Sequence, residues 1–335
     1  MIAYLVRRVL IAIPLLLVVS FVVFYLSRSV GGDPVDAILG EKGGRGETRA
    51  RIIKQYGLDK PIVVQYLIYL KGVVRGDFGT SYIMQEESVS AEIAKRLPRT
   101  MELTLAAMFI AIVLGIPAGV LSAVYKSSWV DYLCMGVSLA GVSVPVFWLG
   151  LLFILAFGGW LPISGNIDPT LSIRTVTGFL LIDTLLAGNL SAWWSAVLHL
   201  ILPALTLSTI PLAMTARITR SSMLDVLGSD YIRTARAKGL HGLSIVMRHA
   251  FRNALIPVVT LLGLEFGYLL GGAVLTEKVF DWPGMGTYLV NRVFQSDPIA
   301  ICGASIVVAA IFIFVNLVVD VLYAFIDPRI RYGQA

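Results

Sequence analysis

Charged residues are scarce in this chain: they make up 14% of its 335 residues, whereas soluble domains usually carry about 25%. Histidine and cysteine are rarer still. The three histidines lack the spacing of metal ligands, and both cysteines fall in apolar stretches, where they act as small buried residues rather than as a disulfide pair. These residues are His199, His241, His249, Cys134 and Cys302. The composition excludes a soluble globular domain and argues against a metal centre.

Motifs that bind nucleotides or support hydrolysis are also missing. The chain has no G-x-x-x-x-G-K-[ST] phosphate-binding loop, and no Gly-Lys pair at all. The H-E-x-x-H motif of zinc peptidases and the G-x-S-x-G motif of serine hydrolases do not occur either. We therefore expect no catalytic residue, no metal site and no cofactor in this chain.

Apolar residues, in contrast, make up 57% of the chain and come in long blocks. A helix that crosses a bilayer needs about 20 consecutive apolar residues. The blocks predict an all-α polytopic membrane protein with six transmembrane helices. Their approximate ranges are 9–26, 101–124, 132–157, 197–216, 254–275 and 299–325.

We divide the chain into three parts. Residues 1–27 hold the N-terminal tail and the first helix, whose apolar core is longer than the 7–15 residues typical of a signal peptide. Residues 28–100 predict a helical subdomain outside the cytoplasm, because apolar residues recur there with helical period; a passive linker would not need them. Residues 101–335 hold the other five helices, with an interfacial or re-entrant piece expected within 158–196.

Basic residues predict the orientation of the chain. The loops expected in the cytoplasm carry twelve Lys and Arg residues, seven of them between Arg217 and Arg252, against three in the short outer loops. Short cytoplasmic loops are enriched in Lys and Arg. Both termini and the segment 217–252 are therefore expected on the cytoplasmic side.

The segment 228–239 is the most polar part of the membrane-like half. Ser229 or Asp230 can cap a helix, basic residues fill its last turn, and Gly239 can end it. A short helix with defined ends favours a docking element for a soluble partner over a merely solvated loop, since the chain has no energy source of its own. The expected docking residues are Asp230, Tyr231, Arg233, Thr234, Ala235, Arg236, Lys238 and Gly239.

The fifth span carries an ionisable residue in its middle, Glu265, where burial in lipid is costly and a functional role is the default hypothesis. Glu265 could face a translocation path, as could Asn316 in the last span, or each could bond to another helix. The same span has a glycine every four residues, a stripe that allows close helix packing. The stripe consists of Gly263, Gly267 and Gly271.

Several motifs together resemble the first permease subunit of ABC importers of the dipeptide, oligopeptide and nickel group. One is Asp230-Tyr-Ile-Arg-Thr-Ala-Arg-Ala-Lys-Gly239, followed by Arg248-His-Ala-Phe-Arg-Asn-Ala-Leu-Ile-Pro257. The resemblance covers nearly the whole chain, and Arg233-Thr-Ala235 replaces the Glu-Ala-Ala of importers in general, as in the peptide group. Other matches are Gly32-Asp-Pro34, Gly57-Leu-Asp-Lys-Pro61, Gly76-Asp-Phe-Gly79, Arg96-Leu-Pro98, Val279-Phe-Asp-Trp-Pro-Gly-Met-Gly286, Val315-Asn-Leu-Val-Val-Asp320 and Asp327-Pro-Arg-Ile-Arg331.

The resemblance implies the type I ABC importer transmembrane fold, with the 28–100 insert between its first two helices. It also implies four kinds of partner: a second, similar permease, two cytoplasmic ATPase subunits that bind ATP and Mg²⁺, an extracytoplasmic substrate-binding protein, and the lipid of the inner membrane. No nucleic acid is expected. The substrate would be a short peptide.

Other functions remain open on the sequence alone. The same type of importer could carry a nickel chelate, glutathione, an opine or an oligosaccharide. An ion-gradient-driven secondary transporter belongs to a different class, and such folds usually show internal repeats, of which we find none. A membrane anchor for a complex would require neither Glu265 nor the glycine stripe.

Overall fold

The computed structural model describes residues 2–30, 35, 47–55, 57–81 and 88–326. Across these residues the chain is helical, and its extended pairing is limited to one isolated bridge between Thr80 and Ser88. Two of the motifs, Gly32-Asp-Pro34 and Asp327-Pro-Arg-Ile-Arg331, lie outside the described residues.

Five helices are long and apolar enough to span a membrane, or six if a bent pair counts as one span. The described residues thus agree with the six predicted spans. The long helices are α1 (Ile2–Val30), α5 (Val89–Val124), α9 (Leu190–Leu227), α12 (Arg252–Val279) and α14 (Pro298–Ile326), and the bent pair is α6 (Trp129–Ser143) with α7 (Val146–Phe157). Shorter helices are α3 (Glu47–Gln55), α4 (Ile62–Val73), α8 (Leu180–Leu186), α10 (Asp230–Ala237), α11 (Gly242–Ser244), the π-helix η1 (Ile245–Phe251) and α13 (Met285–Phe294).

The third predicted span, over 132–157, is not one straight helix but the bent pair α6 and α7. The chain bends by 109° between α6 and α7. The cause is Pro145, because a residue before proline is pushed out of the helical region. Val144 is accordingly extended, with φ −94° and ψ 129°, and α7 starts directly after Pro145.

The helices α5 and α9 extend into segments that were predicted to be separate from their spans. The helix α5 begins at Val89 instead of residue 101 and continues through Pro98, so the last part of the 28–100 insert belongs to this span. The helix α9 covers 190–227 instead of 197–216, so Trp193 and Trp194 stand in its first turns. The predicted ranges were drawn from runs of apolar residues, which cover only the part of a helix that suits lipid. The helical hydrogen bonds continue into the polar residues on either side.

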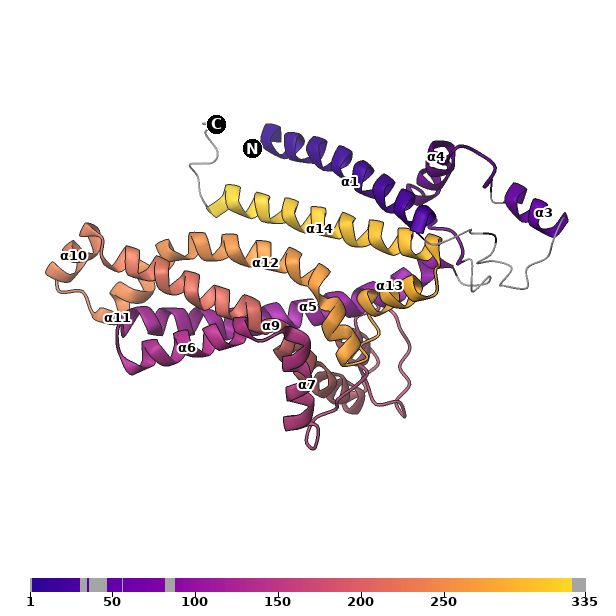
Figure 1. The fold of residues 1–335 in the computed structure, drawn as a ribbon. Coiled ribbons are helices and arrows are strands. Elements are labelled where there is room, and N and C mark those ends of the chain that lie inside the picture. The colour runs from indigo at the N-terminus through magenta and orange to yellow at the C-terminus, as the bar shows by residue number, and fades with distance from the viewer. Residues whose placement is uncertain (1, 31–34, 36–46, 56, 82–87, 327–335) are drawn as a thin grey trace.

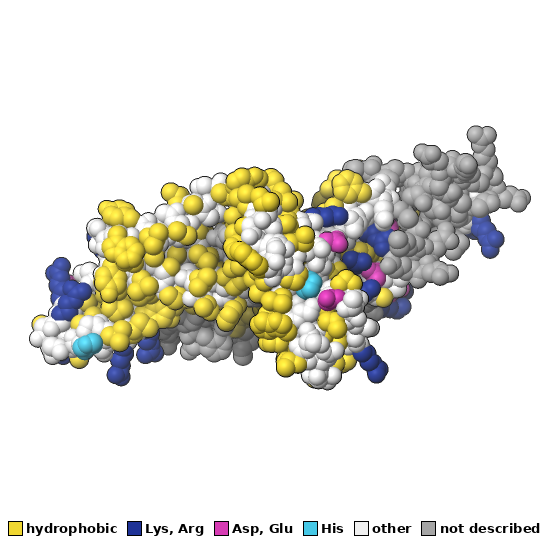
Figure 2. Space-filling model, turned by 90° about the horizontal axis from the view of Figure 1, so that it is seen from below, with side chains coloured by type: hydrophobic (Ala, Val, Ile, Leu, Met, Phe, Trp, Pro, Cys, Tyr) yellow, Lys and Arg dark blue, Asp and Glu magenta, His cyan; other side chains and the backbone are white. Residues whose placement is uncertain are grey.

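Figure 1 shows the long helices side by side, with α10 and α11 at one end of the bundle and α4 and α13 at the other. We call these the α10 end and the α13 end. The helix α1 begins and α14 ends toward the α10 end (Figure 1). Figure 2 shows hydrophobic side chains over much of one face, with Lys and Arg side chains at the α10 end. Such a face suits contact with lipid, where apolar side chains need not be buried.

The helices α5 and α9 form the most extensive contact in the bundle. The contact depends on two small residues of α5, Gly115 and Gly119. A Cβ atom at Gly119 would lie 2.5 Å from the carbonyl oxygen of Ala216 and 3.0 Å from the backbone nitrogen of Arg220. The two backbones therefore touch without intervening side chains, which is the usual reason for glycine at a helix crossing in membranes.

At the α13 end, α4 packs against α1. The hydroxyl groups of Ser20 and Tyr66 lie 2.7 Å apart, and the ring of Tyr66 meets those of Phe21 and Phe24 edge-on. The short helix α3 precedes α4, and Gly57 lies between them at φ 63°. Whether these helices form a subdomain outside the cytoplasm stays a prediction.

Candidate coupling site

The helix α10 has the ends that its sequence predicted. It starts after Ser229 and carries Asp230 in its first turn and Arg236 in its last, which suits the helix dipole. Lys238 is the C-cap residue, and Gly239 follows with φ 72°, a left-handed conformation that glycine adopts without strain. Ser229 occupies the N-cap position, but its side chain donates to the carbonyl oxygen of Val226 (2.6 Å) instead of capping the helix.

One face of α10 is packed into the bundle. Ile232 and Ala235 are buried, and they lie one turn apart on the same face. They join a hydrophobic cluster from α5, α9, η1 and α12, formed with Ala123, Met223, Ile245, Ala250 and Ala254. On the same helix, the hydroxyl of Tyr231 accepts a hydrogen bond from Nδ2 of Asn253, at 2.8 Å. Through this cluster α10 adjoins residues of three long helices, α5, α9 and α12.

The other face of α10 is open to solvent. It presents Asp230, Arg233, Thr234, Arg236 and Lys238. Arg233 and Asp230 form an ion pair of 3.3 Å, but their side chains are 75% and 95% exposed, so the pair contributes little to stability. Three of these exposed residues are basic, and Figure 2 shows Lys and Arg side chains at this end of the bundle.

The chain after α10 is helical from Gly242 onward. The helices α11, η1 and α12 follow one another directly, so the basic residues Arg248 and Arg252 stand at the start of a long span. Seven residues in π-helical geometry are unusual, and such stretches occur often at functional sites.

The two residues predicted for a translocation path are not brought together. Glu265 is half-buried on α12 and has no hydrogen bond or ion pair within the part of the chain that the structure describes. Asn316 on α14 donates from Nδ2 to the carbonyl oxygen of Phe312 in its own helix, at 2.9 Å. Gly267 faces that helix, and Glu265, two residues earlier, points about 200° away from it. Glu265 is thus turned from α14.

The three glycines of the predicted stripe have different surroundings. A Cβ at Gly267 would lie 3.0 Å from the ring of Phe312, so α12 and α14 approach closely there. Gly263 is buried. Gly271 is exposed, has no atom of the described chain within reach of a Cβ, and lines an apolar cavity of about 490 Å³ between α1, α12, α13 and α14.

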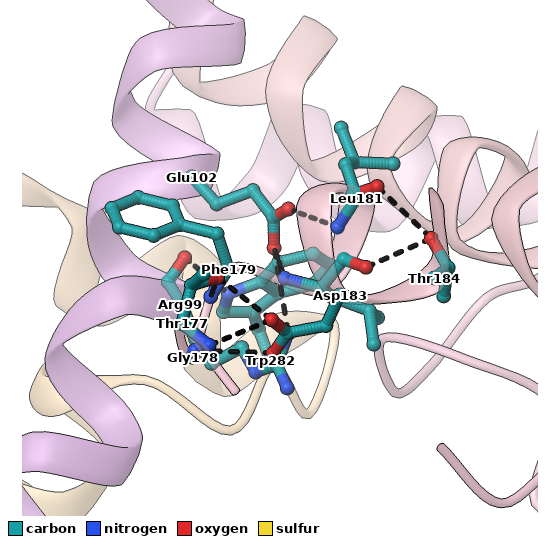
Figure 3. Close-up of polar contacts among 10 residues, drawn as sticks. Arg99, Glu102, Thr177, Gly178, Phe179, Leu181, Asp183, Thr184 and Trp282 are labelled. Carbon is teal, nitrogen blue, oxygen red and sulfur yellow. Dashed lines mark hydrogen bonds and ion pairs between the residues drawn. The ribbon is translucent and has the colours of Figure 1, made fainter. Parts of the chain in front are cut away.

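Sequence reasoning missed a polar cluster at the α13 end, which Figure 3 shows. The carboxylate of Glu102 accepts hydrogen bonds from the backbone N–H groups of Leu180 (3.2 Å) and Leu181 (2.7 Å), the first residues of α8. The carbonyl oxygen of Arg99 accepts from Nε1 of Trp282 at 3.0 Å. A single turn of α5 thus holds both the start of α8 and the loop before α13.

Asp183 closes the turn before α8. Its carboxylate accepts from the backbone N–H and the hydroxyl of Thr177, at 2.8 and 2.7 Å, and from the N–H of Gly178 at 3.1 Å (Figure 3). Burial alone raises the pKa of Asp183, but these hydrogen bonds outweigh it and hold the pKa below its usual value. Asp183 is therefore ionised at neutral pH and stabilises this turn.

Glu277 fixes the loop motif Val279–Gly286 from the end of α12. Its carboxylate accepts from the hydroxyl of Thr100 (2.6 Å) and the backbone N–H of Thr287 (2.8 Å). A Cβ at Gly284 or Gly286 would collide with this carboxylate, which explains both glycines. Glu277 thereby serves as a remote cap for the start of α13.

The sequence does contain a signal for these residues. Glu102 and Glu277 are carboxylates that border long apolar blocks, and a buried charge must find hydrogen-bond donors. Their donors are backbone N–H groups of distant segments, which no local pattern reveals. Groups of His, Cys, Asp and Glu that could hold a metal ion do not occur among the described residues.

Family models match most of the chain. The model of the "Binding-protein-dependent transport system inner membrane component" matches residues 115–332, and that of the corresponding N-terminal region matches residues 1–104. The Di/tripeptide transport system permease protein DppB of Pseudomonas aeruginosa is 46% identical over 337 residues and is covered completely, as is this chain. The Dipeptide transport system permease protein DppB of Alkalihalophilus pseudofirmus is 45% identical, with 99% of this chain and 100% of the relative covered.

A solved structure shares the fold. An inward-facing conformation of the MetNI methionine ABC transporter superposes with a TM-score of 0.54 at 14% identity, covering 71% of this chain and 97% of that chain. At this identity the similarity concerns the fold alone.

Proposed function

Because this chain belongs to the family of binding-protein-dependent transport system inner membrane components, we propose that it carries di- or oligopeptides through the membrane, short peptides above all. It is a transmembrane subunit of an ABC importer with the type I importer fold. It crosses the inner membrane several times and is a transport component, not an enzyme. The peptide assignment is supported by the names of relatives 45–46% identical over the full chain.

The observation that carries the mechanism is the two-sided environment of α10. Ile232 and Ala235 anchor one face in the bundle, while Arg233 and Arg236 on the other face stay in solvent. Two ATPase subunits would dock on such exposed helices, one on each permease subunit. When ATP binding closes the ATPases, α10 would move as a rigid body and shift the long helices with it.

The orientation that fits this mechanism places the α10 end in the cytoplasm. The basic residues of segment 217–252 support it, because Lys and Arg concentrate in cytoplasmic loops. The α13 end, with α4, α8 and α13, would then face the extracytoplasmic binding protein that delivers the substrate.

The second permease subunit would complete the translocation path. Glu265 is half-buried and turned away from α14, which would leave it able to meet either the peptide or the partner permease in the assembly. A carboxylate in the path could pair with the amino terminus of a peptide. Asn316, which bonds its own helix, is the weaker of the two path residues.

Stimulated ATP hydrolysis tests this function. The complex of both permeases and two ATPase subunits, reconstituted in liposomes, should hydrolyse ATP several-fold faster when the binding protein is added with a dipeptide. The empty binding protein and the binding protein with a nickel chelate or glutathione serve as controls. Stimulation by one of those ligands and none by dipeptides would overturn the peptide assignment.

A further inference from the structure

We propose that the buried ion pair between Asp131 and Arg220 is the positioning pair that couples α10 to the transmembrane helices. It makes the ends of α5, α6 and α9 a single rigid block, so that a push on α10 moves all three together. The inference rests on the proposed function, since it assigns a role within ATP-driven transport. It adds two residues that are not among the predicted docking residues of 230–239.

The geometry of the pair is that of a fully satisfied carboxylate. Nε and Nη2 of Arg220 each donate to a different oxygen of Asp131, both at 2.7 Å. The carboxylate also accepts from the hydroxyl of Ser122 and from the backbone N–H of Ser127, the latter at 2.9 Å. The side chain of Asp131 is 5% exposed and that of Arg220 is 28% exposed. Two parallel hydrogen bonds fix the direction as well as the distance between the two residues.

The four groups come from three helices and from the loop that joins two of them. Ser122 is in the last turn of α5, Ser127 is in the loop after it, and Asp131 is in the first turn of α6. Arg220 is on α9, 89 residues along the chain from Asp131. The loop is held in a strained form, with Ser127 at φ 61°, which its hydrogen bond to Asp131 stabilises. The pair thus joins the α5–α6 connection to α9.

Its position along α9 points to force transmission rather than to packing alone. Arg220 stands seven residues before Leu227, where α9 ends, and only Gly228 and Ser229 separate that end from α10. Seven helical residues span about 10 Å. On its other side Arg220 adjoins the closest α5–α9 contact, at Gly119. The ion pair therefore lies between α10, which the ATPase subunits would displace, and the α5–α9 crossing, which would transmit the displacement.

The apolar contacts at this end cannot replace the pair. Ile232 and Ala235 of α10 lie in a cluster of small and aliphatic side chains, which resist separation but allow sliding. A bidentate Arg–carboxylate contact resists rotation of α9 about its own axis, because rotation breaks both hydrogen bonds. Without the ion pair, the last two turns of α9 can rotate when α10 is displaced, while α5 and α6 stay in place.

Transport per ATP hydrolysed, measured in proteoliposomes of the complete complex, tests the proposal. The variants are Arg220→Lys, which keeps the charge but loses the second hydrogen bond, and Asp131→Asn. The control is Arg217→Gln, an exposed arginine one turn earlier on α9. We expect both variants to retain the ATPase subunits, because α10 is unchanged, and to lose about tenfold or more in peptide uptake per ATP. The control should match the wild type.

Two outcomes would overturn the proposal. One is uptake per ATP equal to the wild type in Arg220→Lys. The other is a loss of peptide uptake and of ATP hydrolysis that are equal to each other and match the reduced yield of the complex. A pair with a purely structural role would produce that result. If Asp131→Asn does not fold, Arg220→Lys decides the question alone. A failure of the proposed function is distinguishable, because the wild-type complex itself would then take up no peptide.

Discussion

Arg233→Glu combined with Arg236→Glu is expected to abolish binding of the ATPase subunits while the transmembrane fold stays intact. Both side chains are exposed on the outer face of α10, and neither belongs to the apolar cluster beneath it. Reversing two charges at a docking surface replaces attraction by repulsion, and like-charge contacts cost several kcal/mol. Co-purification of the ATPase subunits with the tagged permease measures the loss, and the melting temperature of the permease measures the fold.

A matched double variant separates docking from net charge. Lys126 and Arg217 are exposed basic residues at the same end of the bundle but off α10. Lys126→Glu with Arg217→Glu changes the net charge by the same amount, and the ATPase subunits should remain bound. Equal retention by both double variants would show that α10 is not the docking element.

Gly119→Leu is expected to prevent correct assembly of the bundle. A Cβ at this position would lie 2.5 Å from the Cβ of Thr219 and from the carbonyl oxygen of Ala216, both on α9. Leucine favours helix more than glycine does, so only the clash can destabilise the protein. Overpacking typically costs about 1–3 kcal/mol, and more where backbone atoms must move. The yield of monodisperse protein in detergent and its melting temperature measure the effect.

Gly136→Leu provides the control for this substitution. Gly136 is inside α6, and a Cβ there would meet no atom of the described chain within 4 Å. The control should be as stable as the wild type. If Gly119→Leu melted at the temperature of Gly136→Leu, α5 and α9 would not touch at their backbones.

The features that the sequence predicted correctly all have local causes. A long apolar block is recognisable as a transmembrane span without knowledge of its neighbours. The helix α10 is likewise recognisable from a polar stretch that ends at Gly239. Gly115 and Gly119 also follow a local pattern, because small residues four apart share a side of a helix. Their partner on α9, however, was not recognisable.

The features that were missed depend on contacts between distant segments or on a single dihedral angle. The bend at Val144 and Pro145 interrupts an otherwise uniform apolar block, so composition alone favours one straight span. Glu102 is paired with backbone groups 78 and 79 residues away. Asp131 and Arg220 are 89 residues apart, and no local pattern indicates that they pair. Only the folded chain shows that these charges are buried.

Uptake of a radiolabelled dipeptide into proteoliposomes tests the central claim most directly. The complete complex is reconstituted with the loaded binding protein on one side and ATP on the side of the ATPase subunits. This subunit has no nucleotide site of its own, so import must be driven by the ATPase subunits. We therefore expect uptake with ATP and no uptake with a non-hydrolysable analogue, whatever ion gradient is imposed. Uptake driven by a proton or sodium gradient in the absence of ATP would contradict it and favour a secondary transporter.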